Sequence, residues 1–140
     1  MEHIVTTQWK QNLQFESDNP SGHTVIMDTS VENGGDGSGL SPKAMMLSSL
    51  AGCSGLDVIS VLNKMKVTLD DFKIIVTGKL TEVHPKYYQS VTVSYHFYGS
   101  KLDKKKLKKA VDLSVEKYCG VMEMFRKFAE VTIDIQFISV

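Results

Sequence analysis

Apolar and polar residues alternate in six short stretches of the chain. Successive side chains of a strand point to opposite faces, so this alternation predicts strands with one face on a core. The six predicted strands are His3–Trp9, Asn12–Ser17, His23–Thr29, Asp70–Val83, Tyr88–Tyr98 and Val131–Val140. Lys10-Gln11 forms a short connection and Asp18–Gly22 is rich in turn-forming residues, so the first three strands are expected to form a meander. The two long strands that follow are joined near His84-Pro85-Lys86.

One segment, Ser41–Lys66, carries apolar residues all round a predicted helix instead of on one face. Ser41 is a good N-cap residue and Pro42 suits the first helical position, so we expect the helix to begin there. Serine, asparagine, aspartate and lysine residues interrupt the apolar run. The segment is therefore predicted to be a long, central, buried core helix and not a membrane span.

Two further helices are predicted in the last third of the chain. Asp103 is expected to cap the first, whose apolar residues share one face, and Cys119-Gly120 breaks it before a short helix over Val121–Phe128. The order of elements predicts a single α+β domain over residues 1–140, with a mainly antiparallel sheet of about six strands. A helix that is apolar on all sides is hard to cover in a chain of this size, so we expect a second subunit to cover it.

The composition, with 42% hydrophobic and 23% charged residues in a chain of 140, is that of an ordinary globular domain. Sixteen basic and 16 acidic residues cancel, so neither nucleic acid nor an anionic membrane is expected as a partner. The lysine-rich stretch Lys101–Lys109 is expected to be a solvated face. The N-terminus lacks the pattern of a signal peptide, and a cytoplasmic location is expected.

The glycine-rich segment Glu32–Gly39 precedes the central helix, a position in which some proteins bind phosphate. It contains no phosphate-binding glycine motif. We expect it to be a mobile linker.

Two cysteines are the candidate reactive residues, Cys53 in the central helix and Cys119 at the helix break. Their separation of 66 positions matches no zinc or redox motif, and no permanent disulfide is expected in a reducing compartment. From the residues alone, a cysteine in an apolar helix is most often a small core residue. The four histidines are scattered, so neither a metal nor a cofactor is expected.

Several short motifs follow one another along the chain in a characteristic order and spacing. They are Ser21-Gly22-His23, Ser41-Pro42, Ala51-Gly52-Cys53, Asp57-Val58, His84-Pro85-Lys86, Ala110–Ser114 and Lys117-Tyr118-Cys119. In this order they resemble the OsmC/organic hydroperoxide resistance (Ohr) family, and most of all its YhfA-like branch. The resemblance covers nearly the whole chain. It implies an intertwined homodimer whose central helices pack together, with two active sites at the subunit interface.

The resemblance also implies an activity and a role in stress response. In that activity Cys53 is the peroxidatic cysteine, which attacks an organic or inorganic hydroperoxide, and Cys119 is the resolving cysteine, which condenses with the resulting sulfenic acid. An unidentified thiol reductant then restores both thiols by exchange. An apolar pocket at the interface would favour organic hydroperoxides.

The attack requires a thiolate, and an apolar pocket by itself disfavours one. Peroxidases of the family use an arginine from the N-terminal strands and a glutamate directly after the helix-starting proline. This chain has Lys43 at the glutamate position, and its single arginine is Arg126. Lys10, His23, Lys43 and Arg126 are the candidate substitutes. Glu123 is a candidate acid partner of Cys119.

Two other functions are compatible with the same residues. One is a non-enzymatic dimer that binds a small apolar or electrophilic ligand, with Cys53 in the wall of the pocket. The other is a redox sensor that oxidises but turns over poorly. A reaction with hydroperoxide that consumes two thiols per chain would separate the enzyme from the binding protein.

Overall fold

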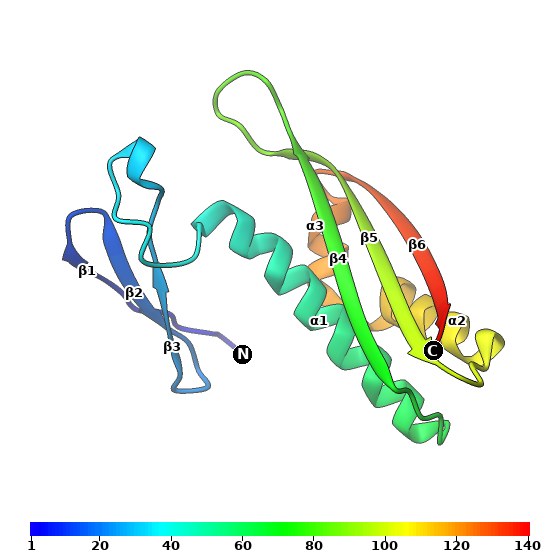
Figure 1. Ribbon diagram of the computed structural model, residues 1–140. Coiled ribbons are helices and arrows are strands. Elements are labelled where there is room, and N and C mark those ends of the chain that lie inside the picture. Colours follow the sequence, from blue (N-terminus) through cyan, green and yellow to red (C-terminus); the bar gives the residue numbers. More distant parts are fainter. The chain divides into compact units, whose positions relative to one another are not determined.

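The computed structural model describes residues 1–140, and its six strands and three α-helices follow one another in the predicted order (Figure 1). The strands are β1 (Thr7–Gln11), β2 (Gln14–Asp18), β3 (Thr24–Met27), β4 (Asp71–Leu80), β5 (Tyr88–Gly99) and β6 (Glu130–Ser139). The helices are α1 (Pro42–Lys64), α2 (Lys104–Leu113) and α3 (Gly120–Arg126), with a 3-10 turn at Val31–Asn33 and a π-helical turn at Ser114–Tyr118. The predicted α+β fold is confirmed. The chain divides into two compact units, Met1–Met46 and Leu47–Val140.

The six strands form two three-stranded sheets, which corrects the prediction of one sheet of about six. β1, β2 and β3 make an antiparallel meander, and β4 pairs antiparallel with β5. β6 pairs parallel with β5. The chain between β5 and β6 passes through α2 and α3, and a crossover of this length returns the next strand in the same direction.

The first turn of the meander lies two residues later than predicted. Lys10 and Gln11 belong to β1, and the connection is Asn12-Leu13. Asn12 has a φ of 47°, in the left-handed region that asparagine adopts more readily than most residues. The indole Nε1 of Trp9 donates to the carbonyl oxygen of Asn12 at 2.7 Å. The conformation of the turn therefore depends on a residue that the alternation pattern assigned to a strand.

The glycine-rich loop before α1 is folded around one buried carboxylate, so it is not the plain linker that was predicted. Asp28 is only 3% exposed and accepts hydrogen bonds from the backbone N–H groups of Thr29, Asp36 and Ser38, at 2.7, 3.2 and 3.1 Å. The Ser38 hydroxyl donates to the same carboxylate at 2.6 Å. A Cβ atom at Gly35 would lie 2.2 Å from the Thr29 carbonyl oxygen, so only glycine fits there.

Acidification is expected to loosen the N-terminal unit through Asp28. Hydrogen bonds, first that of the Ser38 side chain, lower the pKa of Asp28 from 3.8 to about 2. A carboxyl whose pKa is lower in the folded state stabilises that state above its unfolded pKa, and this contribution disappears as pH falls from about 4 to about 2. Trp9 is the only tryptophan and lies in β1, so its fluorescence reports on this unit.

The matched variants are Asp28→Asn and Asp36→Asn. We expect Asp28→Asn to be less stable at pH 7 and to lose the wild-type fluorescence change between pH 4 and 2. Asp36→Asn removes a neighbouring carboxyl and should behave like the wild type. Equal acid profiles for all three proteins would refute the role assigned to Asp28.

In the C-terminal unit, α1 packs on the sheet along a single stripe of residues four positions apart. This stripe is Leu50, Ser54, Val58 and Leu62. Alternate side chains of β5, including Val93, Tyr95 and Phe97, form the facing core. Other faces of α1 remain open within one chain, and Leu56 is 76% exposed. These open faces agree with the expectation that one chain cannot cover a helix that is apolar on all sides, and its complete burial by a second subunit stays a prediction. By length and composition alone α1 could cross a membrane, a test that core helices of soluble proteins also pass.

Candidate functional site

Cys119 lies where the chain leaves one helix and begins another. The predicted cap of α2 is confirmed, since the Asp103 carboxylate accepts from the Lys106 N–H at 3.1 Å. α2 passes into the π-helical turn Ser114–Tyr118, and Cys119 then adopts an extended conformation as the N-cap of α3. Its Sγ accepts a hydrogen bond from the Met122 N–H at 3.3 Å. The predicted helix break therefore holds the sulfur at the start of α3, and the Cys119 residue is only 4% exposed.

Cys53, Asp57 and Cys119 form one cluster. The two Sγ atoms and a carboxylate oxygen of Asp57 all lie within 4.8 Å of one another, with Cys119 buried and the other two half-buried. Asp57 follows Cys53 by four residues, so the two side chains share a face of α1. This spacing was a signal available in the sequence. In the sequence Asp57 stands out only as an interruption of the apolar run and as part of the Asp57-Val58 motif.

A buried polar network lies directly behind this cluster. The Ser54 hydroxyl is hydrogen-bonded to the Tyr95 hydroxyl at 2.6 Å and to the Ser114 hydroxyl at 2.8 Å. Ser114 also donates to the Asp57 carboxylate at 3.3 Å. Ser54, Ser114 and Tyr95 are fully buried, so the network joins α1, β5 and the π-helical turn at the point where Asp57 is held. No pattern in the sequence pairs these three hydroxyls.

The surroundings of the cluster change the acidity of the Cys119 thiol. The pKa of the Cys119 thiol is raised to about 11, first by burial and then by its hydrogen bond and electrostatic interaction with Cys53 and by the charge of Asp57. The Met122 N–H acts in the opposite direction. Cys119 is therefore a protonated thiol at neutral pH and can donate a hydrogen bond to its neighbours. Burial likewise raises the pKa of Tyr95 to about 12, so its phenol is neutral.

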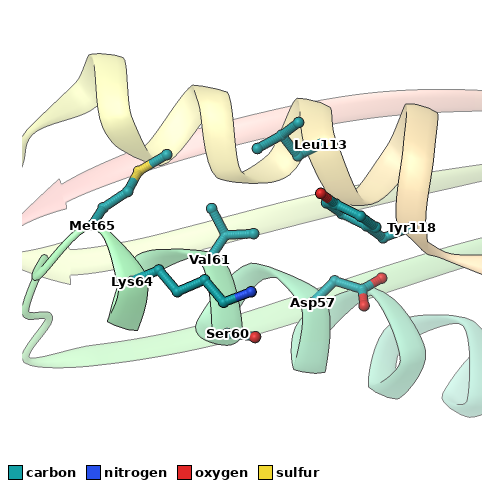
Figure 2. A pocket seen from close by; sticks show the side chains of 7 residues that line it. All are labelled: Asp57, Ser60, Val61, Lys64, Met65, Leu113 and Tyr118. Atoms are coloured by element: carbon teal, nitrogen blue, oxygen red, sulfur yellow. The ribbon is translucent and has the colours of Figure 1, made fainter.

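Asp57 also lies at one end of a pocket of about 310 Å³ (Figure 2). The pocket is lined by Asp57, Ser60, Val61, Lys64, Met65, Leu113 and Tyr118. α1 supplies one wall, and Leu113 and Tyr118 lie on the other side. Most of the pocket wall is apolar, and Lys64 and Asp57 provide one charge of each sign. This volume can hold a small ligand beside the cysteine cluster.

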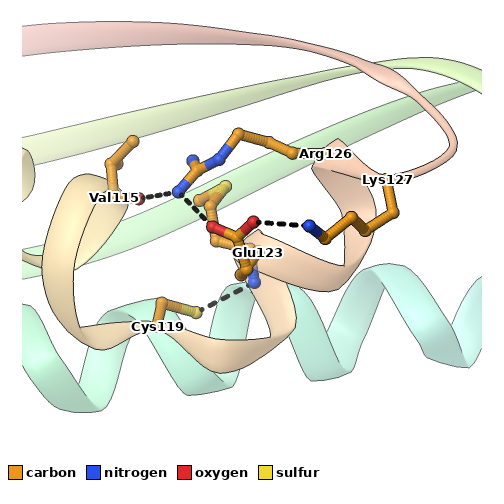
Figure 3. Close-up of polar contacts among 6 residues, drawn as sticks. Val115, Cys119, Glu123, Arg126 and Lys127 are labelled. Atoms are coloured by element: carbon orange, nitrogen blue, oxygen red, sulfur yellow. Dashed lines mark hydrogen bonds and ion pairs between the residues drawn. The ribbon is translucent and has the colours of Figure 1, made fainter.

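Two of the predicted activating or partner residues, Glu123 and Arg126, interact with each other on α3 (Figure 3). Arg126 Nη2 donates to the Val115 carbonyl oxygen at 2.5 Å and lies 3.5 Å from Glu123 Oε2. Lys127 pairs with the other oxygen of Glu123 at 3.5 Å. Figure 3 shows these side chains in one group, with the Cys119 sulfur directed instead to a backbone nitrogen.

The other three predicted activating residues belong to the N-terminal unit. Lys10 lies in β1, His23 precedes β3 and Lys43 is in the first turn of α1. The cluster within the C-terminal unit thus contains both predicted cysteines and an unpredicted carboxylate, and its three members include no basic residue.

Comparison with known proteins identifies the family of this chain. Residues 35–134 match the family model described as OsmC-like protein. The chain belongs to the OsmC-like family. It is 34% identical to the Escherichia coli K12 protein YhfA over 125 residues, which cover 89% of this chain and 90% of YhfA. The predicted resemblance to the YhfA-like branch is confirmed.

Several solved structures share the fold of this chain. A hypothetical protein from Aquifex aeolicus VF5 is 31% identical with a TM-score of 0.86, covering 100% of this chain and 98% of that protein. An organic hydroperoxide resistance protein OsmC from Legionella pneumophila is 18% identical with a TM-score of 0.68, covering 97% of both chains. At that identity the second likeness establishes the fold alone. Family membership and the neighbouring cysteines fit a hydroperoxide-related redox role.

Proposed function

We propose that this OsmC-like protein reduces organic or inorganic hydroperoxides with Cys53 as the peroxidatic and Cys119 as the resolving cysteine. The observation that carries the proposal is the approach of the two sulfurs and the Asp57 carboxylate within 4.8 Å, from elements 66 positions apart in sequence. Two cysteines brought together at that separation, one on a core helix and one at a helix cap, are placed for reversible sulfur chemistry.

In the first step the Cys53 thiolate attacks the hydroperoxide. A sulfur–oxygen bond forms, the oxygen–oxygen bond breaks, and the departing alkoxide takes a proton and leaves as the alcohol. The Cys119 thiol, which is protonated at neutral pH, is placed to supply this proton. That transfer leaves Cys119 as the thiolate that the second step requires.

In the second step the Cys119 thiolate attacks the sulfenic acid of Cys53. The disulfide forms, the sulfur–oxygen bond breaks, and hydroxide leaves and is protonated to water. The sulfurs must close from within 4.8 Å to about 2.05 Å. A thiol reductant then supplies two electrons by disulfide exchange. Since this cycle needs reduced cysteines, the proposed location is the cytoplasm.

A homodimer is part of the proposal, because α1 leaves a large apolar groove uncovered. The groove has a volume of about 640 Å³, and its walls include Leu56, Ile59, Phe72 and Ile74. A Cβ atom added at Gly52 would have no neighbour within 4 Å, so another chain can approach the helix closely there. A second copy of α1 offers a matching apolar face, and such a self-complementary contact is typical of two-fold dimers.

A redox sensor with slow turnover is the second candidate. It is favoured by the composition of the cluster, in which Cys53 is surrounded by Asp57 and the Cys119 thiol. The three members of the cluster include no basic side chain that would activate the attacking sulfur for rapid turnover. A sensor would lose the same two thiols as the enzyme, but it would consume little hydroperoxide in repeated cycles with a reductant.

Thiol counting after a single exposure to hydroperoxide tests the proposal. The reduced protein is mixed with a small excess of an organic hydroperoxide, and free thiols are measured with time. We expect two thiols per chain to be lost, and much faster than in the same chain unfolded in denaturant, where the cysteines react as ordinary thiols. Thiol loss no faster than in the unfolded chain would refute hydroperoxide chemistry and leave a protein that binds a ligand.

A further inference from the structure

The cluster of Cys53, Asp57 and Cys119 contains the ligand types of a metal centre as well as those of a redox pair. A sulfur, a second sulfur and a carboxylate oxygen lie within 4.8 Å of one another. Around a tetrahedral Zn²⁺ with bonds of about 2.0 to 2.3 Å, neighbouring ligand atoms are roughly 3.5 to 3.8 Å apart. The three atoms are therefore close enough to converge on one ion after small movements.

Two of the three candidate ligands, Asp57 and Cys119, already accept a hydrogen bond from another residue. The Asp57 carboxylate accepts a hydrogen bond from Ser114, whose hydroxyl is fixed by the buried Ser54. The Cys119 sulfur accepts from the Met122 N–H at 3.3 Å. Such outer contacts orient the ligands of protein metal sites and strengthen binding. They distinguish this cluster from an accidental group of exposed acidic side chains.

The charges of the cluster also favour a cation. Once a bound cation has displaced both thiol protons, the three groups supply three negative charges in a partly buried place, and no salt bridge to Lys or Arg neutralises Asp57. Two soft sulfur ligands with one carboxylate select a thiophilic ion such as Zn²⁺ over Mg²⁺ or Ca²⁺. Asp57 lines the 310 Å³ pocket, which gives an ion a route to the cluster and leaves room for water as a fourth ligand.

We propose that the reduced protein binds one thiophilic divalent cation per chain through Cys53, Cys119 and Asp57. Binding replaces the two thiol protons, which are released to the solvent, and forms two metal–sulfur bonds and one metal–oxygen bond. The same two sulfurs cannot hold the metal and form a disulfide. The cation therefore protects both cysteines from oxidation, and disulfide formation releases it.

Cobalt(II) is the probe, because its tetrahedral thiolate complexes absorb visibly and its geometry resembles that of Zn²⁺. The reduced protein is titrated with Co²⁺ without oxygen, and equilibrium dialysis gives the stoichiometry. We expect one ion per chain and a thiolate-to-cobalt charge-transfer band that disappears when both thiols are blocked with iodoacetamide. Added Zn²⁺ should displace the cobalt and abolish the band.

Variants assign the ligands. Cys53→Ser and Cys119→Ser should each remove about half of the charge-transfer intensity and weaken binding. Asp57→Asn keeps an oxygen for the Ser114 hydrogen bond but removes the charge, and its Kd for Co²⁺ should rise at least about tenfold. Asp112→Asn, a surface carboxylate paired with Lys108, is the matched control and should bind as the wild type does. Circular dichroism verifies that each variant is folded.

Two results would overturn the site. One is the absence of a thiolate band at one equivalent of Co²⁺, and the other is an unchanged affinity in Asp57→Asn. No hydroperoxide is used, so the outcome is independent of the thiol-counting experiment. A protein that binds cobalt but does not react with hydroperoxide would retain the metal site and lose the proposed activity, and the reverse result would retain only the activity.

Discussion

Replacement of Cys53 by serine is expected to abolish the reaction with organic hydroperoxide, with a decrease in rate of at least about 1,000-fold. A serine hydroxyl is protonated at neutral pH and is a weak nucleophile without an adjacent base, so it cannot replace a thiolate. The remaining Cys119 cannot take over, because burial raises the pKa of its thiol to about 11 and keeps it protonated. Thiol counting on Cys53→Ser should therefore show no fast loss of the remaining thiol.

Cys119→Ser should give a different result in the same measurement. It keeps the nucleophile, so the first turnover should consume one thiol and leave Cys53 as a sulfenic acid, which a dimedone adduct detects by mass spectrometry. No intramolecular disulfide can form, and excess hydroperoxide should drive Cys53 on to sulfinic acid. If Cys53→Ser reacts as fast as the wild type, or if Cys119→Ser loses no thiol, the assigned roles are wrong.

The rate of the first step also tests whether Cys119 lies close enough to Cys53 to donate a proton to the leaving group. Cys119→Ala, unlike Cys119→Ser, leaves neither a thiol nor a hydroxyl donor beside Cys53, so a slower first step in the alanine variant would mean that Cys119 supplies the proton to the leaving alkoxide. An unchanged first step would assign that proton to water instead. Either result leaves Cys53 as the nucleophile, which the first variant tests alone.

Much of the fold followed from local patterns. Alternation located every strand to within a few residues, and Pro42 and Asp103 marked the starts of α1 and α2. These signals could be recognised in the sequence because each depends only on residues within one short segment. The division into two sheets did not follow, because it depends on which strands pair across long separations. The first turn was predicted at Lys10-Gln11, two residues too early, because the left-handed conformation of Asn12 leaves no mark in the alternation pattern.

The residues of the candidate site also fall into a predictable and an unpredictable group. The two cysteines could be selected by residue type and by the family resemblance, but their approach within 4.8 Å is a tertiary result. Asp57 was predictable from its spacing to Cys53 on one helix face. The Ser54, Tyr95 and Ser114 hydroxyls were not, since serines and tyrosines are common in strands and helices and only the packing of three elements brings these together. The basic side chains that the sequence suggested as activating residues do not belong to the cluster.

Leu56→Asp is expected to separate the proposed dimer into monomers. Leu56 is 76% exposed in the single chain and lies in the groove along α1, where a second copy would bury it. A carboxylate at this position would have to lose its hydration without a partner, so the dimer Kd should rise at least about 30-fold, the effect typical of an interface hot spot. The fold of each chain should be unaffected, because the side chain contributes nothing to the core of the monomer.

Light scattering coupled to size exclusion measures the change directly. The chain has a mass of 15.6 kDa, so the wild type should elute at twice that value and Leu56→Asp at 15.6 kDa at low micromolar concentration. Val83→Asp is the matched control, because Val83 is 78% exposed but lies outside the groove, and this variant should remain dimeric. A monomeric wild type would refute the dimer. A dimeric Leu56→Asp would place the interface elsewhere, and the apolar face of α1 would then have to be explained by a different partner.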